Sequence, residues 1–414
     1  MAPPEKRQRR NTFMPESPVA CTLPADLILE IVARTNPSTL VCCAAACKDL
    51  RRDILSPSFI RRVTQQDGIL PSRFLAYLYT NKDVDAPRPL SLVHPVMPAV
   101  VSFCNDHLAP FMSCYTVDLL CEYEPMTPRG GLVLIQRRHI RLRQNNSNHL
   151  CVYDFITGDR TFFSAPSGIS IDWDFITYVL LTATDGIGCP FKLVVADVDS
   201  NLDGTGCNIR VLTATSLNVG HTSWGPVTYD GDIAPTIGSL QRERDGVVVH
   251  GSVIHWLVCG YDKILTYNVH KGSLDTTKLP PVKCQESQRH LGKSPDGKLW
   301  LLVADGFTVS FWLQLNDGEW EREAVIDVEE KLWSLHPYIP PGPVIIEFEG
   351  SGEMSSAVLL RMWSNESPHG PLIILDMETK EMRRQAKRLV FSSLMFEFDL
   401  SERLLAKKTF SEVC

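Results

Sequence analysis

Residues 22–63 read TLPADLILEIVARTNPSTLVCCAAACKDLRRDILSPSFIRRV, and they distinguish a helical N-terminal unit from the rest of the chain. The first apolar residues recur at the spacing of one face of a helix with 3.6 residues per turn. They are Leu23, Leu27, Ile28, Ile31 and Val32. Pro24 suits an opening helical turn, where its missing N–H is no loss. The stretch therefore predicts a first amphipathic helix.

Two prolines divide the stretch further. Asn36 precedes a proline and is disfavoured in helical conformation, yet it can cap a new helix that has Pro37 at its first position. Ser56-Pro57 makes a second break, so we expect a third short helical element after the second helix. Three short helices form a core too small to be robust by itself. An apolar surface that remains on such a unit is usually covered by something else.

These residues resemble the F-box, through which substrate receptors of SCF-type (Skp–cullin–F-box) ubiquitin ligases dock onto a Skp-family adaptor. The resemblance rests on Leu23-Pro24, on Asp26-Leu27, on Ile31-Val32 and on Cys47-Lys48 followed by Leu50. It implies partnership with the adaptor, and through it with a cullin. The adaptor-binding residues that it implies are Leu23, Pro24, Leu27, Ile28, Ile31, Val32, Leu40, Cys47, Lys48 and Leu50.

Three positions depart from the family pattern. Leu50 stands where the family often has tryptophan, Thr35 where leucine is common, and Ala46 where a larger branched residue is usual. Each change removes apolar area, which is worth ~25 cal/mol per Å² when buried, so the departures imply weaker adaptor binding. An alternative is that the helices are an internal cap packed on the chain's own larger domain.

Charge and hydropathy exclude several classes of protein. The 414 residues include 41 basic and 48 acidic side chains, a formal charge of −7, and the basic ones form no long stripe beyond the N-terminus. Binding to nucleic acid is therefore not expected. No apolar run approaches the ~18 residues of a membrane span, and no secretory signal is evident. We expect a cytoplasmic or nuclear protein, without a membrane partner, whose 13 cysteines are mostly reduced.

The chain divides into four parts. Residues 1–21 are rich in proline and charge, so we expect a disordered tail. Its basic run KRQRR is either a nuclear-import signal or simply solvated. Residues 22–63 are the helical module, and residues 64–90 are expected to be a connector. Residues 91–414 show the sequence pattern of an all-β domain, which makes the chain an α+β multidomain protein.

Short runs rich in branched residues predict strands at 132–135, 178–181, 191–195 and 299–303. Gly251-Ser252 and Asp296-Gly297 predict hairpin turns. A weak internal repeat links strand ends that carry an acidic or amide residue followed by a turn. Its copies are YDFITG at 153–158, YNVHKG at 267–272, LDMETK at 375–380 and a shortened LNDG at 315–318, with Asp197 as a further candidate.

This repeat resembles the F-box-associated domains common in plants, many of which are kelch-type β-propellers. At blades of ~40 to 50 residues, the resemblance implies roughly six or seven blades in residues 91–414. A pair of β-sandwiches or an irregular all-β domain is the alternative. Either alternative keeps the all-β expectation.

The chemistry-bearing patterns are weak. Gly292-Lys293-Ser294 imitates the end of a phosphate-binding loop, but the first glycine and the following helix of that motif are missing. A zinc site is conceivable only with loose spacing; its candidate ligands are Cys104, His107, Cys114 and Cys121. His250 and His255 bracket a hairpin without a nearby nucleophile. We therefore expect no catalytic residue, no metal and no cofactor.

Two functions from different classes remain. The first is a substrate receptor whose helices hold the adaptor and whose β domain recruits a target protein for ubiquitination, with Trp224 as a candidate target-binding residue. The second is a propeller enzyme or a non-ligase scaffold with an internal helical cap. An exposed surface at Leu27, Ile31 and Leu50 would favour the first.

Overall fold

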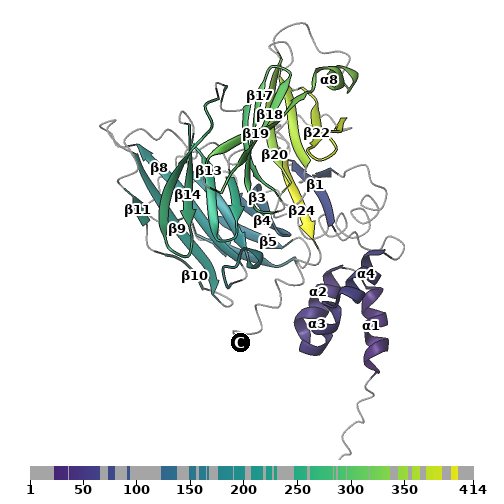
Figure 1. The fold of residues 1–414 in the computed structure, drawn as a ribbon. Coiled ribbons are helices and arrows are strands. Elements are labelled where there is room, and N and C mark those ends of the chain that lie inside the picture. The colour runs from purple at the N-terminus through teal and green to yellow at the C-terminus, as the bar shows by residue number, and fades with distance from the viewer. Residues whose placement is uncertain are drawn as a thin grey trace, which may run out of the picture.

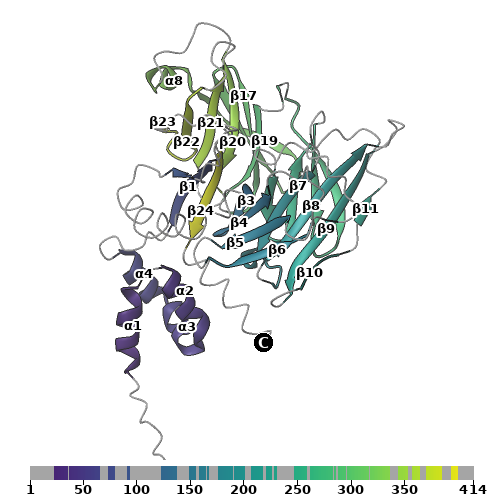
Figure 2. The same ribbon diagram turned by 180° about the vertical axis from the view of Figure 1, so that it is seen from behind.

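The computed structural model describes residues 23–35, 37–65, 73–79 and 91–93, together with most of residues 123–399. The larger gaps in that last range are 138–148, 167–175, 201–206, 231–246, 336–343, 364–369 and 385–392. A group of helices precedes an all-β region with a propeller-like arrangement of sheets (Figures 1 and 2). The described part of the chain contains no helix long and apolar enough to span a membrane.

The helical module contains four helices where the sequence predicted three. They are α1 (Ala25–Ala33), α2 (Pro37–Ala46), α3 (Lys48–Ile54) and α4 (Pro57–Gln65). The predicted prolines do mark helix starts, and Pro24 is the residue before α1. The additional break falls at Cys47, whose extended backbone (φ −141°, ψ 130°) ends α2 and starts α3. Nothing in the apolar pattern announced this break, because cysteine is compatible with either conformation.

The module has an apolar core that continues into the β region. Val32, Leu40 and Ile54 are buried in it, and the same cluster contains Tyr123 and Phe396 from the sheets. Figure 1 shows the four helices grouped near one end of β24. One face of the module is therefore already used by internal packing and by the neighbouring sheets.

Six sheets are formed by the described strands. Four of them have four strands each, which follow one another in chain order. The first contains β3 (Tyr123–Arg129), β4 (Leu132–Arg137), β5 (Leu150–Asp154) and β6 (Arg160–Phe163), and the second contains β12 (Val247–His250), β13 (Val253–Leu257), β14 (Lys263–Asn268) and β15 (Ser273–Lys278). The third contains β16 (Arg289–Lys293), β17 (Leu299–Asp305), β18 (Thr308–Gln314) and β19 (Trp320–Asp327), and the fourth contains β20 (Ile345–Ser351), β21 (Ala357–Trp363), β22 (Leu372–Asp376) and β23 (Met382–Arg384). A fifth contains β7 (Ile176–Thr182), β8 (Phe191–Ser200), β9 (Cys207–Leu217), β10 (His221–Trp224) and β11 (Thr228–Asp230). A three-stranded sheet contains β1 (Arg73–Tyr79), β2 (Ser91–Val93) and β24 (Ser393–Asp399).

The structure has four regular blades and not the six or seven that were predicted. Four sheets have the regular four-stranded form of a blade, and the other two have five and three strands. The predicted count assumed a constant number of residues per blade. That assumption fails because the β7–β11 sheet has long strands and an additional one, and because the three-stranded sheet combines both ends of the β region. The propeller-like arrangement itself is present.

The three-stranded sheet joins distant parts of the chain. All seven residues of β1 pair antiparallel with β24, from Arg73 opposite Asp399 to Tyr79 opposite Ser393. The segment expected to be a connector thus supplies a strand to the β region. Strand β24 also contacts β3 and β20, while β3 contacts β7, and β16 contacts both β12 and β20. These contacts place the edge strands of successive sheets around a common axis.

The internal repeat marks one structural position. Asp154, Asn268 and Asp376 each end the third strand of a four-stranded sheet, and each carbonyl accepts a hydrogen bond from the N–H four residues later. At that later position Gly158 and Gly272 have positive φ. The shortened LNDG copy also lies between third and fourth strands, but Asp197 lies within β8, so including it was wrong. The strands and hairpins predicted around Gly251 and Gly297 are confirmed.

Candidate functional site

Three large apolar side chains on α1 and just before it are more than half exposed. Leu23, Leu27 and Ile31 are 54%, 51% and 55% exposed. Their spacing of four residues puts them on one side of the helix and its leading turn. The N–H groups of Leu27 and Ile28 both donate to the carbonyl of Pro24, which continues the helical turn back toward Leu23. The three side chains therefore form one surface, here called the α1 face.

The opposite side of α1 explains this orientation. Val32 and Ala33 are buried in the module, and Ile28 packs partly against the same cluster. Glu30 forms ion pairs with Arg34, the residue that follows α1, and with Arg62 of α4. Because α1 is held against α2–α4 through these contacts, the α1 face points outward without any conformational change.

The structure separates the other residues implied by the F-box resemblance into three groups. Pro24, Cys47 and Lys48 are exposed, Ile28 and Leu50 are partly buried, and Val32 and Leu40 are buried. Leu50, expected on the exposed surface, packs instead against the core of the module. The exposed members of the predicted set are consequently the ones available to a partner without unfolding, and the buried ones support them.

Trp224, the candidate for target binding, lies at the end of β10 and is partly buried. Its ring packs near Phe163 at a centroid distance of 6.4 Å, and its indole N–H donates to the carbonyl of Ser164 at 3.1 Å. These contacts link two neighbouring sheets. Trp224 is thus placed as a packing residue between sheets.

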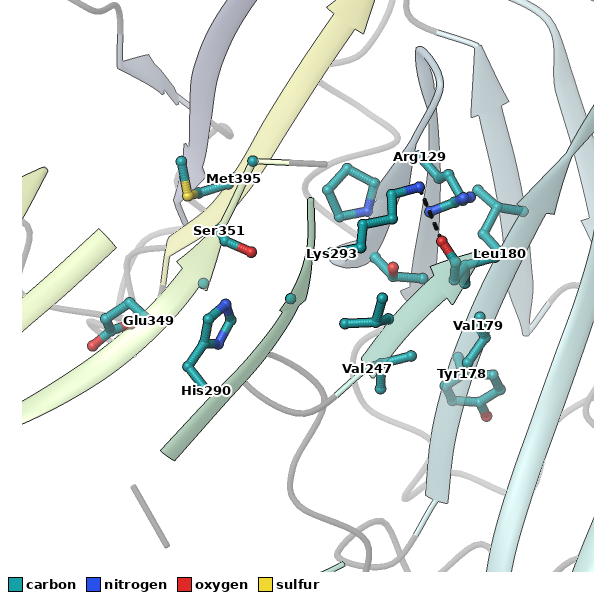
Figure 3. A pocket seen from close by; sticks show the side chains of 17 residues that line it. Arg129, Tyr178, Val179, Leu180, Val247, His290, Lys293, Glu349, Ser351 and Met395 are labelled. Carbon is teal, nitrogen blue, oxygen red and sulfur yellow. Dashed lines mark hydrogen bonds between the residues drawn. The ribbon is translucent and has the colours of Figure 1, made fainter. Parts of the chain in front are cut away.

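A pocket of about 110 Å³ lies where six strands meet, and sequence reasoning missed it. Strands β3, β7, β12, β16, β20 and β24 all contribute lining residues (Figure 3). These six strands come from six different sheets, so the pocket lies on the axis about which the sheets are arranged. We call it the axial pocket.

One residue of the pocket wall, Arg129, belongs to a buried ion pair. Arg129 of β3 donates to both oxygens of Asp185, at 2.9 Å from Nε and 2.5 Å from Nη2. Asp185 belongs to the short helix η3 (Ala183–Asp185) and also accepts from the Thr182 N–H at 2.8 Å. The bidentate geometry fixes the guanidinium at the pocket wall.

Lys293 and Glu349 lie at opposite sides of the pocket. Lys293 extends toward Arg129, and its Nζ donates to the carbonyl of Val249 at 3.0 Å (Figure 3). Glu349 is the additional residue of a β-bulge in β20 and pairs with Arg361. A bulge redirects the side chain at the point where strand pairing is interrupted. The arrangement places Arg129 and Lys293 at one side of the pocket and Glu349, paired with Arg361, at another.

The sequence carried one signal for this pocket. Lys293 lies in the Gly292-Lys293-Ser294 motif that imitated a phosphate-binding loop, but it is on a strand followed by a hairpin. A Cβ on Gly292 would come within 2.0 Å of the Trp300 ring, so this glycine serves packing. Within the described ranges no group of three or more His, Cys, Asp or Glu is placed to hold a metal. The candidate zinc ligands of the sequence analysis, Cys104 to Cys121, lie outside those ranges.

Comparison with protein-family models assigns the chain to a family. Residues 99–410 match a family described as a domain of unknown function, DUF7595, and the chain belongs to it. The helical module and β1 precede the matched region. A search of curated proteins gave no match.

Similar solved structures share about a tenth of their residues with the chain. A protein from Lactobacillus plantarum is 10% identical, with 75% of this chain and 81% of that one covered and a TM-score of 0.38. An oligogalacturonate lyase in complex with manganese is 10% identical, with 61% of each chain covered and a TM-score of 0.32. AztD from Citrobacter koseri is 12% identical, with coverages of 66% and 62% and a TM-score of 0.32. Likenesses at this level carry no information about activity.

Proposed function

We propose that this protein is a substrate-receptor subunit of an SCF-type ubiquitin ligase. In this proposal the helical module is an F-box that docks a Skp-family adaptor and, through it, a cullin. The β region recruits a target protein, and the complex acts in the cytoplasm or nucleus. The observation that carries the proposal is the α1 face, where Leu23, Leu27 and Ile31 are each more than half exposed.

The α1 face is suited to a protein partner in size and composition. Burial of a large aliphatic side chain is worth about 1.5–3 kcal/mol when it goes from fully exposed to buried, and these side chains are half exposed already. Burial of the exposed half of all three therefore supplies about 2–4 kcal/mol, a part of the roughly 4–15 kcal/mol that association loses in rotational and translational freedom, so further contacts of the module must contribute the rest. Asp26 at the start of α1 and Arg34 just beyond its end are exposed charges that can form a polar rim.

The proposed mechanism requires no covalent chemistry from this chain. A receptor that holds its target close to the loaded conjugating enzyme raises the effective concentration of target lysines there. The pairing of β1 with β24 links the segment that follows the helices to the sheets, and one apolar cluster spans both parts. Such a connection favours a fixed distance between adaptor and target, which is what a proximity mechanism needs.

The test is co-purification of the full-length chain with a Skp-family adaptor. The native chain is expected to retain the adaptor, and the double variant Leu27→Asp, Ile31→Asp is expected to lose it. Val325→Asp is the matched control, because Val325 is 53% exposed on β19, far from the helices in sequence. Adaptor binding that survives the double variant, or no binding by the native chain, contradicts the proposal.

A further inference from the structure

We propose that the outer edge of β19 binds an extended, basic segment of a protein partner as an additional strand. If the chain is a receptor as proposed above, this edge is where it would hold its target, and only that assignment rests on the proposed function. The edge itself is argued from the β region alone. Strand addition supplies main-chain hydrogen bonds to an extended segment, and the neighbouring side chains select which segment binds.

Strand β19 is the longest of the described strands that end a sheet away from the axis. It has eight residues, whereas β15 has six and β6, β10, β11 and β23 have three or four. Within the described part of the chain, β19 pairs with β18 and with no other strand. The helix that follows it, α8 (Glu329–Leu335), contacts β23 of the next sheet (Figure 2). A long strand with one unpaired edge is a template for another strand.

Most side chains of β19 are open to solvent. The exposed ones are Glu321, Arg322, Glu323, Val325 and Asp327. Glu321 pairs with Leu313 of β18, and Val325 pairs with Ser310, three residues earlier on that strand. Because side chains alternate between the two faces of a strand, Glu321 and Val325 lie on opposite faces. An added strand would therefore place one kind of side chain beside Glu321 and another kind beside Val325.

The charge along this edge is negative. Strand β19 and helix α8 together carry five carboxylates and two cations. The carboxylates are Glu321, Glu323, Asp327, Glu329 and Glu330. Both cations have contacts of their own, since Arg322 lies over the Trp312 ring at 5.7 Å and Lys331 donates to the carbonyl of Lys380 at 2.7 Å. The ammonium of Lys380, from the neighbouring sheet, lies over the ring of Phe311 on β18. The carboxylates outnumber all three cations.

These charges disfavour a second copy of the chain and favour a basic partner. Two acidic edges repel each other when they pair, which is one way in which edge strands avoid self-association. Opposite charges on adjacent strands stabilise the pairing instead. The geometry thus favours an extended segment in which Lys or Arg alternates with apolar residues, with the basic side chains beside Glu321 and the apolar ones beside Val325.

The probe is a fluorescent peptide of alternating lysine and valine, as long as β19. Its binding to the full-length chain is measured by fluorescence anisotropy at protein concentrations up to ~100 μM. We expect saturable binding that weakens as salt is added, and none by a peptide of alternating glutamate and valine. Methylation of the backbone nitrogens of the lysine–valine peptide keeps its charges but removes its N–H donors, so it is expected to abolish binding.

Two double variants locate the site. Glu321→Lys with Glu323→Lys reverses two charges at the edge and is expected to weaken binding about tenfold or more. Asp49→Lys with Asp275→Lys is the matched control, because it reverses two exposed carboxylates on α3 and β15 and is expected to bind as the native chain does. Hydrogen–deuterium exchange of the native chain needs no variant, and the lysine–valine peptide should slow exchange in β19 and leave β15 unchanged.

The inference is overturned if the lysine–valine peptide does not bind the native chain, if its methylated form binds equally well, or if protection appears outside β19. Binding only after removal of residues 1–21 would also overturn it, because the chain's own basic run KRQRR would then occupy the edge. The outcomes are separable from those of the adaptor test. The variant Leu27→Asp, Ile31→Asp is expected to bind the peptide as the native chain does, whatever its effect on the adaptor.

Discussion

The helical module and the sheets of the β region differ in how completely they bury their apolar side chains. The described residues include six large apolar side chains that are exposed, and three of them, Leu23, Leu27 and Ile31, lie on α1 or directly before it. The other three are Leu315, Val325 and Trp333, which are scattered over the far larger β region. Isolated exposed apolar residues are ordinary, whereas a contiguous group marks an interaction surface. Among the described residues, the β region thus buries its large apolar side chains more completely than the helical module does, and the exposed α1 face is what the proposed adaptor docking requires.

The largest effect on this comparison is expected from removing β24, the strand that joins the two ends of the β region. Ending the chain before Ser393 removes β24, all seven of its pairs with β1, and the buried Phe396. Because β24 also contacts β3 and β20, we expect the sheets to lose cooperative unfolding altogether. Thermal unfolding followed by circular dichroism in the far ultraviolet checks this. A sharp transition at the native Tm would show that β24 is dispensable.

A smaller but still large effect is expected at the buried ion pair. Arg129→Met leaves Asp185 buried without its cation, which costs about 3–5 kcal/mol of unfolding free energy. The double variant Arg129→Met, Asp185→Leu removes both charges and is expected to be clearly more stable than the single variant. Urea unfolding of both proteins measures the difference. Equal stabilities would mean that the pair is not buried as described.

The pH dependence of stability sharpens the comparison, because the β region contains a buried histidine, His149 next to β5, and a partly buried one, His255 in β13. Burial lowers the pKa of His149 and of His255 to about 4. In the unfolded chain both titrate near 6.5, so between pH 6.5 and 4 the unfolded state binds more protons and the folded state loses stability as the pH falls. Full stability is present above pH 6.5, and the loss is up to about 3 kcal/mol for each histidine.

The measurement is the free energy of unfolding in urea at several pH values from 4 to 7. Replacing both residues, as His149→Gln and His255→Gln, is expected to flatten the slope in that window, whatever it does to the stability at pH 7. An unchanged slope in the double variant would assign the pH dependence to other groups.

A prediction of about 1 kcal/mol concerns the repeated turn. Gly272 has φ 64°, and a Cβ there would meet no atom within 4 Å, so Gly272→Ala isolates the backbone preference. We expect a loss of about 1 kcal/mol. Lys380 occupies the equivalent position with φ 59°, so Lys380→Gly should gain stability, by less than 1 kcal/mol, since its contact with the Met377 carbonyl is lost. Thermal unfolding measures both variants. A lower Tm for Gly272→Ala with a higher Tm for Lys380→Gly would confirm that the two turn positions are equivalent, and shifts of the same sign would contradict it.

The smallest expected effect on stability lies on the α1 face. Leu27 and Ile31 are more than half exposed, so Leu27→Asp with Ile31→Asp should change the free energy of unfolding by less than about 0.5 kcal/mol per site. Urea unfolding checks this together with adaptor binding. A large destabilisation would mean that the α1 face is covered by the chain itself, as an internal cap would require.

The sequence predicted what depends on neighbouring residues. The apolar period gave α1, the prolines gave the starts of α2 and α4, and the turn residues gave the repeated strand ends at Asp154, Asn268 and Asp376. It did not predict the break at Cys47 or the partly buried position of Leu50, because these depend on packing among the helices.

The axial pocket and the pairing of β24 with β1 could not be predicted from the sequence, for a different reason. Arg129 and Lys293 come from strands far apart in the chain, and β1 pairs with a strand more than 300 residues later. No local pattern records such a meeting. The sequence pointed to Lys293 only through its partial likeness to a phosphate-binding loop, whereas in the structure Lys293 lies on β16, a strand that faces the axis.

Hydrogen–deuterium exchange of the full-length chain, with and without a purified Skp-family adaptor, tests the central claim most directly. The account predicts that the adaptor slows exchange of backbone amides in α1 and its neighbouring helices, while the amides of β3, β16 and the other axis-facing strands exchange as before. Protection in the sheets with none in α1 would contradict it, as would the absence of any protection at adaptor concentrations that saturate known F-box proteins.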